Sequence, residues 1–273
     1  MRYNRYANIF IITVVFIFLV FEIFPIYWII SNSFKSYKDI TFFPPKFFFK
    51  PTLQNYAVAI QKNNFLSAIL DSGIIAFTSV AISVFIGSLA AYGIVRLKIG
   101  GRWLLMYSVS SRMIPPILLL LPLFIIFSKL KLVDSYFVLI ITYSTLLLSF
   151  TIWQMASFLK DIPQDIEEAA IIDGCGIWQV FFRIVLPMSK PGLTAVAIFS
   201  FLWAWNDFIF ASILVGHDVV TAPVANTYFI IDFVIPWGPM TAASTLIMVP
   251  AFIFILIVQK QMVQGLTMGA VKG

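Results

Sequence analysis

The sequence predicts an all-α, polytopic membrane protein with about six transmembrane helices. Of its 273 residues, 61% are hydrophobic and only 11% are charged, whereas a soluble domain usually carries about 25% charged residues. Several stretches reach the roughly 20 apolar residues that cross a bilayer as a helix. No alternating pattern of about ten residues indicates barrel strands, so helices must satisfy the backbone hydrogen bonds within the hydrocarbon.

Six apolar segments define the predicted spans, and each is long enough to cross the bilayer. They are residues 9–30, 66–95, 103–127, 136–157, 191–215 and 241–258. The first is too long for a signal-peptide core and lacks a small-residue cleavage pattern, so we expect it to be retained. Prolines within the apolar segments are expected to kink helices or to mark their ends. They are Pro115, Pro116, Pro122 and Pro250.

Three parts follow from this division of the chain. Residues 1–64 form an N-terminal helix with an extracytoplasmic loop, residues 65–262 form the transmembrane core, and residues 263–273 form a cytoplasmic tail. The net charge of +6 lies mostly between the apolar stretches, which indicates membrane orientation and headgroup contact rather than nucleic-acid binding. A weak excess of Lys and Arg on one side predicts that both termini are cytoplasmic. With one cysteine, Cys175, the chain has no internal disulfide.

The first outer loop contains five Phe, two Lys and two Pro within residues 42–50. One interpretation places this stretch in the membrane interface, with rings in the lipid and lysines at the headgroups. The other interpretation is a docking surface for a partner protein. The sequence leaves both open.

Residues 158–190 form the longest polar stretch between the late spans, and its local chemistry predicts a helical hairpin outside the bilayer. Asp161 is expected at the N-cap of the first helix, with Pro163 in the first turn. Acidic side chains occupy the early turns, where the helix dipole favours them. They are Asp165, Glu167 and Glu168. Gly174 and Gly176 end this helix, and a second helix over residues 177–185 stops at Pro187.

A small-sided surface on the first helix allows the backbone of another protein to approach closely. Ala169 and Ala170 form this surface, which lies between carboxylate side chains and a glycine. Glu168-Ala169-Ala170 is followed after three residues by Gly174 and, after nine more, by Ile184. One residue then separates Ile184 from Leu186-Pro187. This spacing resembles the EAA loop of permeases of ATP-binding-cassette (ABC) importers at every defined position.

Further segments resemble the MalG-like carbohydrate branch of these permeases. They are Ser88-Leu89-Ala90-Ala91-Tyr92 with Arg96-Leu97, Arg112-Met113-Ile114-Pro115, Trp205-Asn206-Asp207-Phe208 and the tail at residues 265–273. The family more often has Glu at the position of Asp207. Asp71-Ser72-Gly73 replaces the usual Asn-Ser-Leu, and the simplest interpretation leaves Asp71 solvated at the outer end of its span.

The resemblance implies a type I importer in the cell membrane of a prokaryote. Its partners would be a cytoplasmic ABC ATPase dimer, a second permease subunit and an extracytoplasmic solute-binding protein, with a carbohydrate as substrate. Glu168, Ala169, Ala170, Gly174, Ile184, Leu186 and Pro187 would couple to the ATPase. Because the chain has no G-x-x-x-x-G-K-[S/T] loop, ATP and Mg belong to the partner and this chain binds no cofactor.

Polar residues near the deep part of the spans are candidates for the translocation path, because charge there is costly. They are Arg112, Trp205, Asn206 and Asp207. A competing interpretation pairs Arg112 with Asp207 in a salt bridge, or with the sister permease, to hold the bundle together. An ion-coupled secondary transporter is the alternative function, although it usually needs several buried carboxylates and related halves. A membrane-embedded enzyme is a weaker alternative, because no nucleophile–base pair or ligand cluster lies inside the predicted spans.

Overall fold

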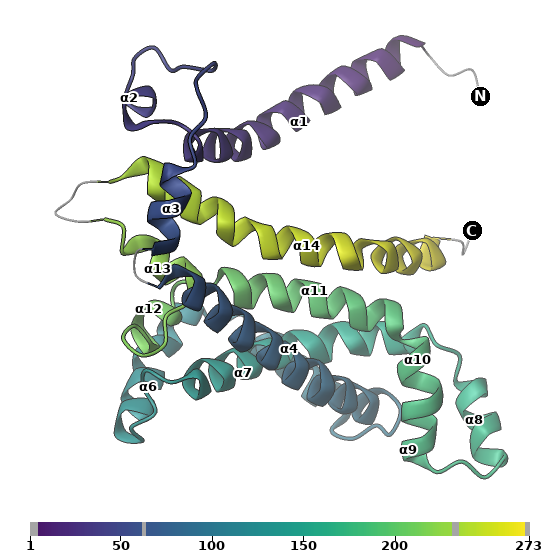
Figure 1. Cartoon of the computed structure of the whole chain (residues 1–273). Helices are drawn as coiled ribbons and strands as arrows, with labels where there is room; N and C mark the ends of the chain where they lie inside the picture. Colours follow the sequence, from purple (N-terminus) through teal and green to yellow (C-terminus); the bar gives the residue numbers. More distant parts are fainter. Residues whose placement is uncertain (1–4, 62–63, 231–234, 271–273) are drawn as a thin grey trace. The chain divides into compact units, whose positions relative to one another are not determined.

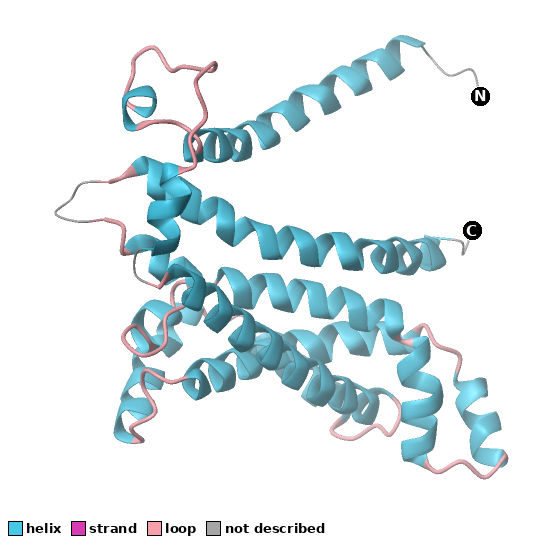
Figure 2. Cartoon of the chain, viewed as in Figure 1, coloured by secondary structure: helices cyan, strands magenta, loops and turns pink. Residues whose placement is uncertain are grey.

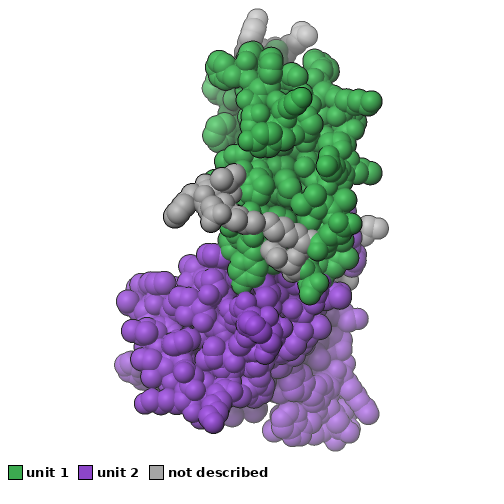
Figure 3. All heavy atoms as spheres, turned by 60° about the vertical axis from the view of Figure 1, so that its left-hand side comes forward, with its two compact units in different colours: residues 1–66, 225–249 green, residues 67–224, 250–273 purple. Residues whose placement is uncertain are grey.

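The computed structural model describes residues 5–61, 64–230 and 235–270. Every regular element within these ranges is helical (Figure 2), which confirms the all-α prediction. The chain divides into two compact units, coloured separately in Figure 3. Unit 1 comprises residues 1–66 and 225–249, and unit 2 comprises residues 67–224 and 250–273.

Figure 1 shows the helices and the loops that connect them. In chain order they are α1 (Arg5–Ser33), α2 (Tyr37–Ile40), α3 (Gln54–Gln61), α4 (Phe65–Val95), α5 (Gly101–Ser111), α6 (Pro116–Lys129), α7 (Tyr136–Lys160), α8 (Gln164–Ile172), α9 (Ile177–Val180), the π-helix η1 (Phe181–Val185), α10 (Leu186–Met188), α11 (Lys190–Asn206), α12 (Ala211–Leu214), α13 (Ala222–Thr227) and α14 (Trp237–Ala270). The predicted tail at residues 263–273 lies partly on α14, and residues 271–273 lie outside the described ranges.

Within the described residues, four helices are individually long and apolar enough to span a membrane, and six spans result if each of two bent pairs counts as one. One bent pair is α5 with α6, whose axes differ by 91°. Together the two helices cover the predicted span over residues 103–127, and they break at the prolines that were expected to kink it. Pro116 opens α6 at its first position, where a proline lacks the N–H needed to continue the preceding helix. Pro122 and Pro250, by contrast, lie inside continuous helices.

The predicted span over residues 191–215 ends early. Helix α11 stops at Asn206, and Asp207 has an extended backbone conformation before the short helix α12 begins. At its other end, α11 is bent by 74° from the helix formed by residues 177–188. Pro187 lies one residue before that helix ends, close to the predicted stop. Asp161 closes α7 instead of opening the hairpin, because the α8 N-cap position belongs to Pro163.

In unit 1, the first outer loop folds back onto the end of α1. Asn55 donates hydrogen bonds to the carbonyls of Ser33 and Lys35, at 2.9 and 2.8 Å. The Lys35 side chain is only 1% exposed and its Nζ lies 4.3 Å from the centre of the Trp28 ring. Burial lowers the pKa of Lys35, against the opposing influence of Asp39. This part of the loop is therefore an ordered cap on α1.

The Phe-rich stretch of the same loop keeps its rings on the surface of the unit. Phe43 is 89% exposed and Phe48 is 96% exposed. Lys46 lies between them in sequence, 2.7 Å from Asp39 and 4.4 Å from the centre of the Phe42 ring. Exposed rings beside a lysine suit the membrane interface or a protein partner equally, so both interpretations stay open.

Unit 2 is built around α7, which contacts α5, α11 and α12. Two glycines let helices approach it closely. A Cβ at Gly87 of α4 would lie 2.5 Å from Cγ2 of Thr151, and one at Gly192 of α11 would lie 2.5 Å from Cγ of Phe158. Ser83 and Thr151 share a buried hydrogen bond of 2.9 Å. Small residues and hydroxyl bridges of this kind are typical of helix packing in membranes.

Candidate functional site: a coupling hairpin and a central cavity

One face of the hairpin is fixed to unit 2 by a buried ion pair. Nε of Arg96, just after α4, lies 2.6 Å from Oε1 of Glu167 on α8, and each side chain is 7% exposed. Nη2 of Arg96 also donates to the carbonyls of Leu159 and Ile162, at 2.8 Å each. The guanidinium thus joins the end of α4, the end of α7 and the start of α8. A buried charge pair is tolerated when further hydrogen bonds satisfy it in this way.

The predicted coupling residues of α8 divide between two faces. Ala170 is buried in a hydrophobic cluster, three positions after Glu167 and so on the same side of the helix. Glu168 and Ala169 are exposed. Gly174 follows the helix with φ +90° and has open space where a Cβ would lie, which is a conformation that glycine adopts without strain. The hairpin therefore presents a small-sided, acidic surface outward.

The second helix of the hairpin returns to the bundle through a π-helical turn at Phe181–Val185. Ile184 and Leu186 pack against the same hydrophobic cluster as Ala170, whereas Pro187 is exposed. The cluster draws its buried residues from several helices. They are Ala91, Tyr92, Met155, Ala156, Leu159, Ala170, Val180, Phe181, Val185 and Val196. Both hairpin helices are thereby packed as one body against α4, α7 and α11.

Arg112 lies in the 91° break between α5 and α6 and lines a cavity of about 430 Å³. The centre of its guanidinium lies 4.7 Å from the centre of the Phe150 ring. Ser149 and Trp203 line the same cavity, and Ser149 is hydrogen-bonded to Ser111 at 2.9 Å. Aromatic faces, hydroxyls and a fixed cation are thus gathered on one hollow, a mixture that suits a polar ligand with apolar faces.

The other predicted path residues lie away from the cavity wall. Trp205 is 2% exposed and stacks on Phe201 at 5.5 Å. Asn206 is exposed and its amide donates to the carbonyl of Leu202 in its own helix. Trp203 and Trp205 are two positions apart, which places them on opposite sides of a helix with 3.6 residues per turn.

Asp207 is held by Tyr143 and by the backbone, and the expected salt bridge to Arg112 is absent from the described residues. Tyr143 donates its hydroxyl to Oδ2 of Asp207 at 2.7 Å. The same oxygen accepts the N–H groups of Phe210 and Ala211, at 3.1 and 3.2 Å. Asp207 therefore ties the end of α11 and the start of α12 to α7. The pairing hypothesis fails because both members have nearer partners.

Two further aspartates hold the segment after α12. Oδ1 of Asp71 accepts the Tyr136 hydroxyl at 2.7 Å, and Oδ2 accepts the N–H of Val220 at 3.4 Å. Ser72 accepts the N–H of Ala222 at 2.7 Å. Asp71 is buried, so the interpretation that it is merely solvated is wrong. The unusual Asp71-Ser72 pair fixes this segment to the first turns of α4.

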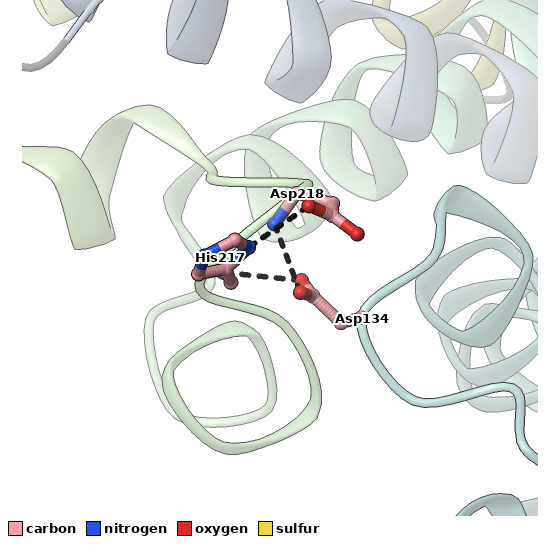
Figure 4. A group of neighbouring side chains, drawn as sticks. All are labelled: Asp134, His217 and Asp218. Atoms are coloured by element: carbon pink, nitrogen blue, oxygen red, sulfur yellow. Dashed lines mark hydrogen bonds and ion pairs between the residues drawn. The ribbon is translucent and has the colours of Figure 1, made fainter.

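Asp134 holds the adjoining turn with both carboxylate oxygens (Figure 4). It accepts the N–H groups of residues 216–219, at 3.0, 3.2, 2.8 and 3.3 Å. His217 and Asp218 lie close by and are paired at 2.9 Å, and these three side chains bring their ligand atoms within 4.8 Å of one another. Because both oxygens of Asp134 already accept backbone hydrogen bonds, the group acts as a loop anchor.

Sequence reasoning missed the residues that orient these sites. Glu167 was noted only for the helix dipole, and Tyr143 and Phe150 were hidden within an apolar span. Trp203 could be a membrane-interface anchor as easily as a sugar platform, so it was not among the predicted path residues, unlike the neighbouring Trp205-Asn206-Asp207 motif. The helical period was the signal that could have identified Glu167. It lies three positions before Ala170 and so on the face of the helix that packs inward.

Comparison with known proteins decides the family. Residues 83–267 match the family described as binding-protein-dependent transport system inner membrane component. The chain belongs to this family. The permease is 36% identical over 260 residues to the trehalose transport system permease protein SugB of Mycobacterium tuberculosis, covering 93% of each chain. It is 36% identical over 257 residues to the trehalose/maltose transport system permease protein MalG of Thermococcus litoralis, covering 92% of each.

A solved structure confirms the fold of the permease. It superposes with a TM-score of 0.80 on a chain in the crystal structure of a bacterial ABC transporter involved in the import of the acidic polysaccharide alginate. The sequences are 21% identical, and the match covers 95% of the permease and 99% of that chain. The predicted MalG-like, type I importer fold is therefore confirmed, and the ion-coupled alternative receives no support.

Proposed function

We propose that this permease forms half of the translocation pathway of a carbohydrate importer and couples to a separate ATPase through the hairpin at residues 164–188. The observation that carries the proposal is the division of the hairpin into two faces. Glu168, Ala169 and Gly174 face outward, while Glu167 and Ala170 are buried against the bundle. A hairpin that offers one face to a partner and is fixed to the spans by the other face can act as a lever between them.

In this proposal the hairpin end of unit 2 faces the cytoplasm, and both termini of the chain are cytoplasmic. The membrane is the cell membrane of a prokaryote. The partners are a cytoplasmic ABC ATPase dimer, a second permease subunit and an extracytoplasmic solute-binding protein. ATP and Mg are bound by the ATPase, and the permease itself is a non-catalytic subunit embedded in lipid. The segment anchored by Asp71 and Asp134 lies at the extracytoplasmic end.

Force passes from the hairpin to the spans through two connections. The Arg96–Glu167 pair ties α8 to the end of α4. The hydrophobic cluster ties α8, α9 and η1 to α7 and α11. Because well-packed interiors shift as bodies rather than deform continuously, movement of the hairpin would rock these spans between inward-open and outward-open states.

The cavity at Arg112 belongs to the translocation path in this proposal. Aromatic faces and hydroxyls suit the apolar faces and hydroxyls of a sugar, and Phe150, Trp203 and Ser149 supply both. The relatives named for trehalose and for trehalose or maltose support a carbohydrate as the substrate class. Substrate sites near the bilayer midplane are established for secondary transporters, and we place the path of this importer at the same depth.

Two hairpin variants test the coupling. Glu168→Lys reverses the outward charge, and Gly174→Asp places a side chain at φ +90° on the turn. Both should leave the membrane fold intact, lower co-purification of the ATPase and separate ATP hydrolysis from transport. Asp218→Lys is the matched control, because it makes the same charge reversal at an exposed position on the opposite end of unit 2. Normal transport in both hairpin variants would refute the lever.

A further inference from the structure

A second cavity, of about 1190 Å³, lies at the hairpin end of unit 2. Its walls come from the last turn of α4, from α5, from the second half of α7 and from the residues that lead into α8. It shares no lining residue with the cavity at Arg112. The proposed coupling and translocation steps leave it without a role.

The charged residues that line this cavity are all basic. They are Arg96, Lys98, Arg102 and Lys160. Arg96 is neutralised by Glu167. Across residues 5–61, 64–230 and 235–270, no ion pair involves Lys98, Arg102 or Lys160, and all three side chains are exposed. Three uncompensated positive charges therefore surround one hollow.

The start of α5 adds to the positive potential. Gly100 occupies the N-cap position and supplies no side-chain acceptor, and no acidic residue lies in the first turn. Gly101 and Arg102 of this turn line the cavity. The N–H of Gly101 donates to the carbonyl of Lys98 at 3.2 Å, and the dipole of the eleven-residue helix favours an anion at this end. The helix and the three cations thus favour the same kind of ligand.

The rest of the cavity wall is apolar. Leu105, Met106 and Val109 of α5 face the cavity, together with Trp153 of α7 and Ile94 of α4. A free phosphate would satisfy the cations and leave this wall against water, at a cost that grows with the apolar area exposed. A neutral sugar would leave the cations unpaired. A molecule with an anionic head and hydrocarbon chains satisfies both parts of the wall.

We propose that this cavity binds an anionic phospholipid, with its phosphate at Lys98, Arg102 and Lys160 and its acyl chains along α5 and Trp153. This inference rests on the proposed orientation, which places the hairpin end at the cytoplasmic leaflet. Basic pockets between transmembrane helices at that leaflet bind acidic headgroups. Ile162, Pro163 and Gln164 line the same cavity, so the bound lipid also supports the start of α8.

The test compares lipid retention by the assembled transporter carrying one of two double variants. Arg102→Gln with Lys160→Gln removes two cavity charges. The control, Lys129→Gln with Lys131→Gln, removes two exposed charges of unit 2 that do not line the cavity. Each complex is titrated with phosphatidylglycerol and with phosphatidylcholine in detergent, and bound lipid is counted by native mass spectrometry. We expect the cavity variant to bind phosphatidylglycerol about 30-fold more weakly, since each cation contributes roughly a factor of five.

Three results would overturn the proposal. The first is equal retention of phosphatidylglycerol by the cavity variant and the control. The second is equal binding of phosphatidylglycerol and phosphatidylcholine by the native complex. The third is loss of the ATPase from the cavity variant with lipid retention unchanged, which would assign the basic surface to ATPase docking. Failure of the proposed coupling would show elsewhere, as normal ATPase binding and transport in Glu168→Lys, and would leave these lipid measurements untouched.

Discussion

Nε of Arg96 donates a hydrogen bond of 2.6 Å to Oε1 of Glu167, across a separation of 71 positions in the sequence. The pair lies between the end of a membrane-spanning helix and the first helix of the hairpin, and its side chains are 7% exposed. Glu168, one position further, is exposed. Neighbouring glutamates in the hairpin therefore differ in position, because Glu167 holds the hairpin to the bundle and Glu168 lies on its exposed face.

Removing Glu167 should destabilise the hairpin far more than removing Glu168. Glu167→Ala leaves the Arg96 guanidinium buried without its counter-charge, which costs about 3–5 kcal/mol. Glu168→Ala alters an exposed side chain and should change the free energy of unfolding by less than about 0.5 kcal/mol. Thermal unfolding of the two variants in detergent measures the difference. Equal unfolding temperatures would show that the ion pair does not hold the hairpin.

Glycine at position 192 should be required for α11 to pack on α7. A Cβ there would lie 2.5 Å from the Phe158 ring, and overpacking of this kind costs about 1–3 kcal/mol. Gly192→Ala should therefore lower the unfolding temperature. Gly73→Ala is the control, because open space surrounds that position in α4 and alanine favours a helix. An unchanged Gly192→Ala variant would contradict the close packing.

The Tyr143 hydroxyl should determine how firmly α12 is held. Tyr143→Phe removes one of the donors to Asp207, and a hydrogen bond to a charged acceptor contributes about 1.5–3 kcal/mol. We expect faster hydrogen exchange at residues 208–215. Tyr107→Phe, at an exposed tyrosine of α5, serves as the control. Identical exchange in the two variants would mean that the remaining backbone donors suffice.

The turn at residues 216–219 should loosen in acid. Burial raises the pKa of Asp134, but four backbone N–H groups favour its charged form more strongly and bring the pKa below the ordinary value. With the folded pKa depressed, this stabilisation is complete above about pH 4 and is lost as the pH falls through the folded pKa.

Hydrogen exchange at residues 216–219, corrected for the intrinsic rate, checks this behaviour. Protection should fall in acid in the native protein. Asp134→Asn should already show weak protection at neutral pH, whereas Asp218→Asn should behave like the native protein. Full protection of the turn in Asp134→Asn at pH 7 would rule out the anchor.

Transport should depend on Trp203 as a wall of the cavity and on Trp205 only through stability. Trp203→Leu removes an aromatic face from the cavity that Arg112 also lines, and an aromatic contact with the substrate should contribute about 0.5–1.5 kcal/mol. We expect uptake to fall by roughly 2- to 10-fold with normal expression and ATPase binding. Trp205→Leu should lower the amount of folded protein instead. Lower uptake by Trp205→Leu at normal expression, with normal uptake by Trp203→Leu, would place the path on the other side of α11.

Sequence by itself determined the class of structure, the approximate spans and the presence of a helical hairpin. These features follow from composition and from chemistry within a few residues, such as apolar length, proline, glycine and the spaced motif around Glu168. The break at Pro116 could be expected for the same reason, although its angle of 91° could not. The motif also pointed to the family that the comparisons then confirmed.

Only the tertiary structure decided which side chains meet. Arg112 and Asp207 were plausible partners by charge, yet packing gave Arg112 the ring of Phe150 and gave Asp207 the hydroxyl of Tyr143. Packing likewise brought Arg96 to Glu167 and Asp71 to Tyr136. Such pairs join helices that are distant in the chain. Their choice depends on how helices pack and bend, because a side chain's reach is only a few ångströms and local sequence does not encode which helix lies within it.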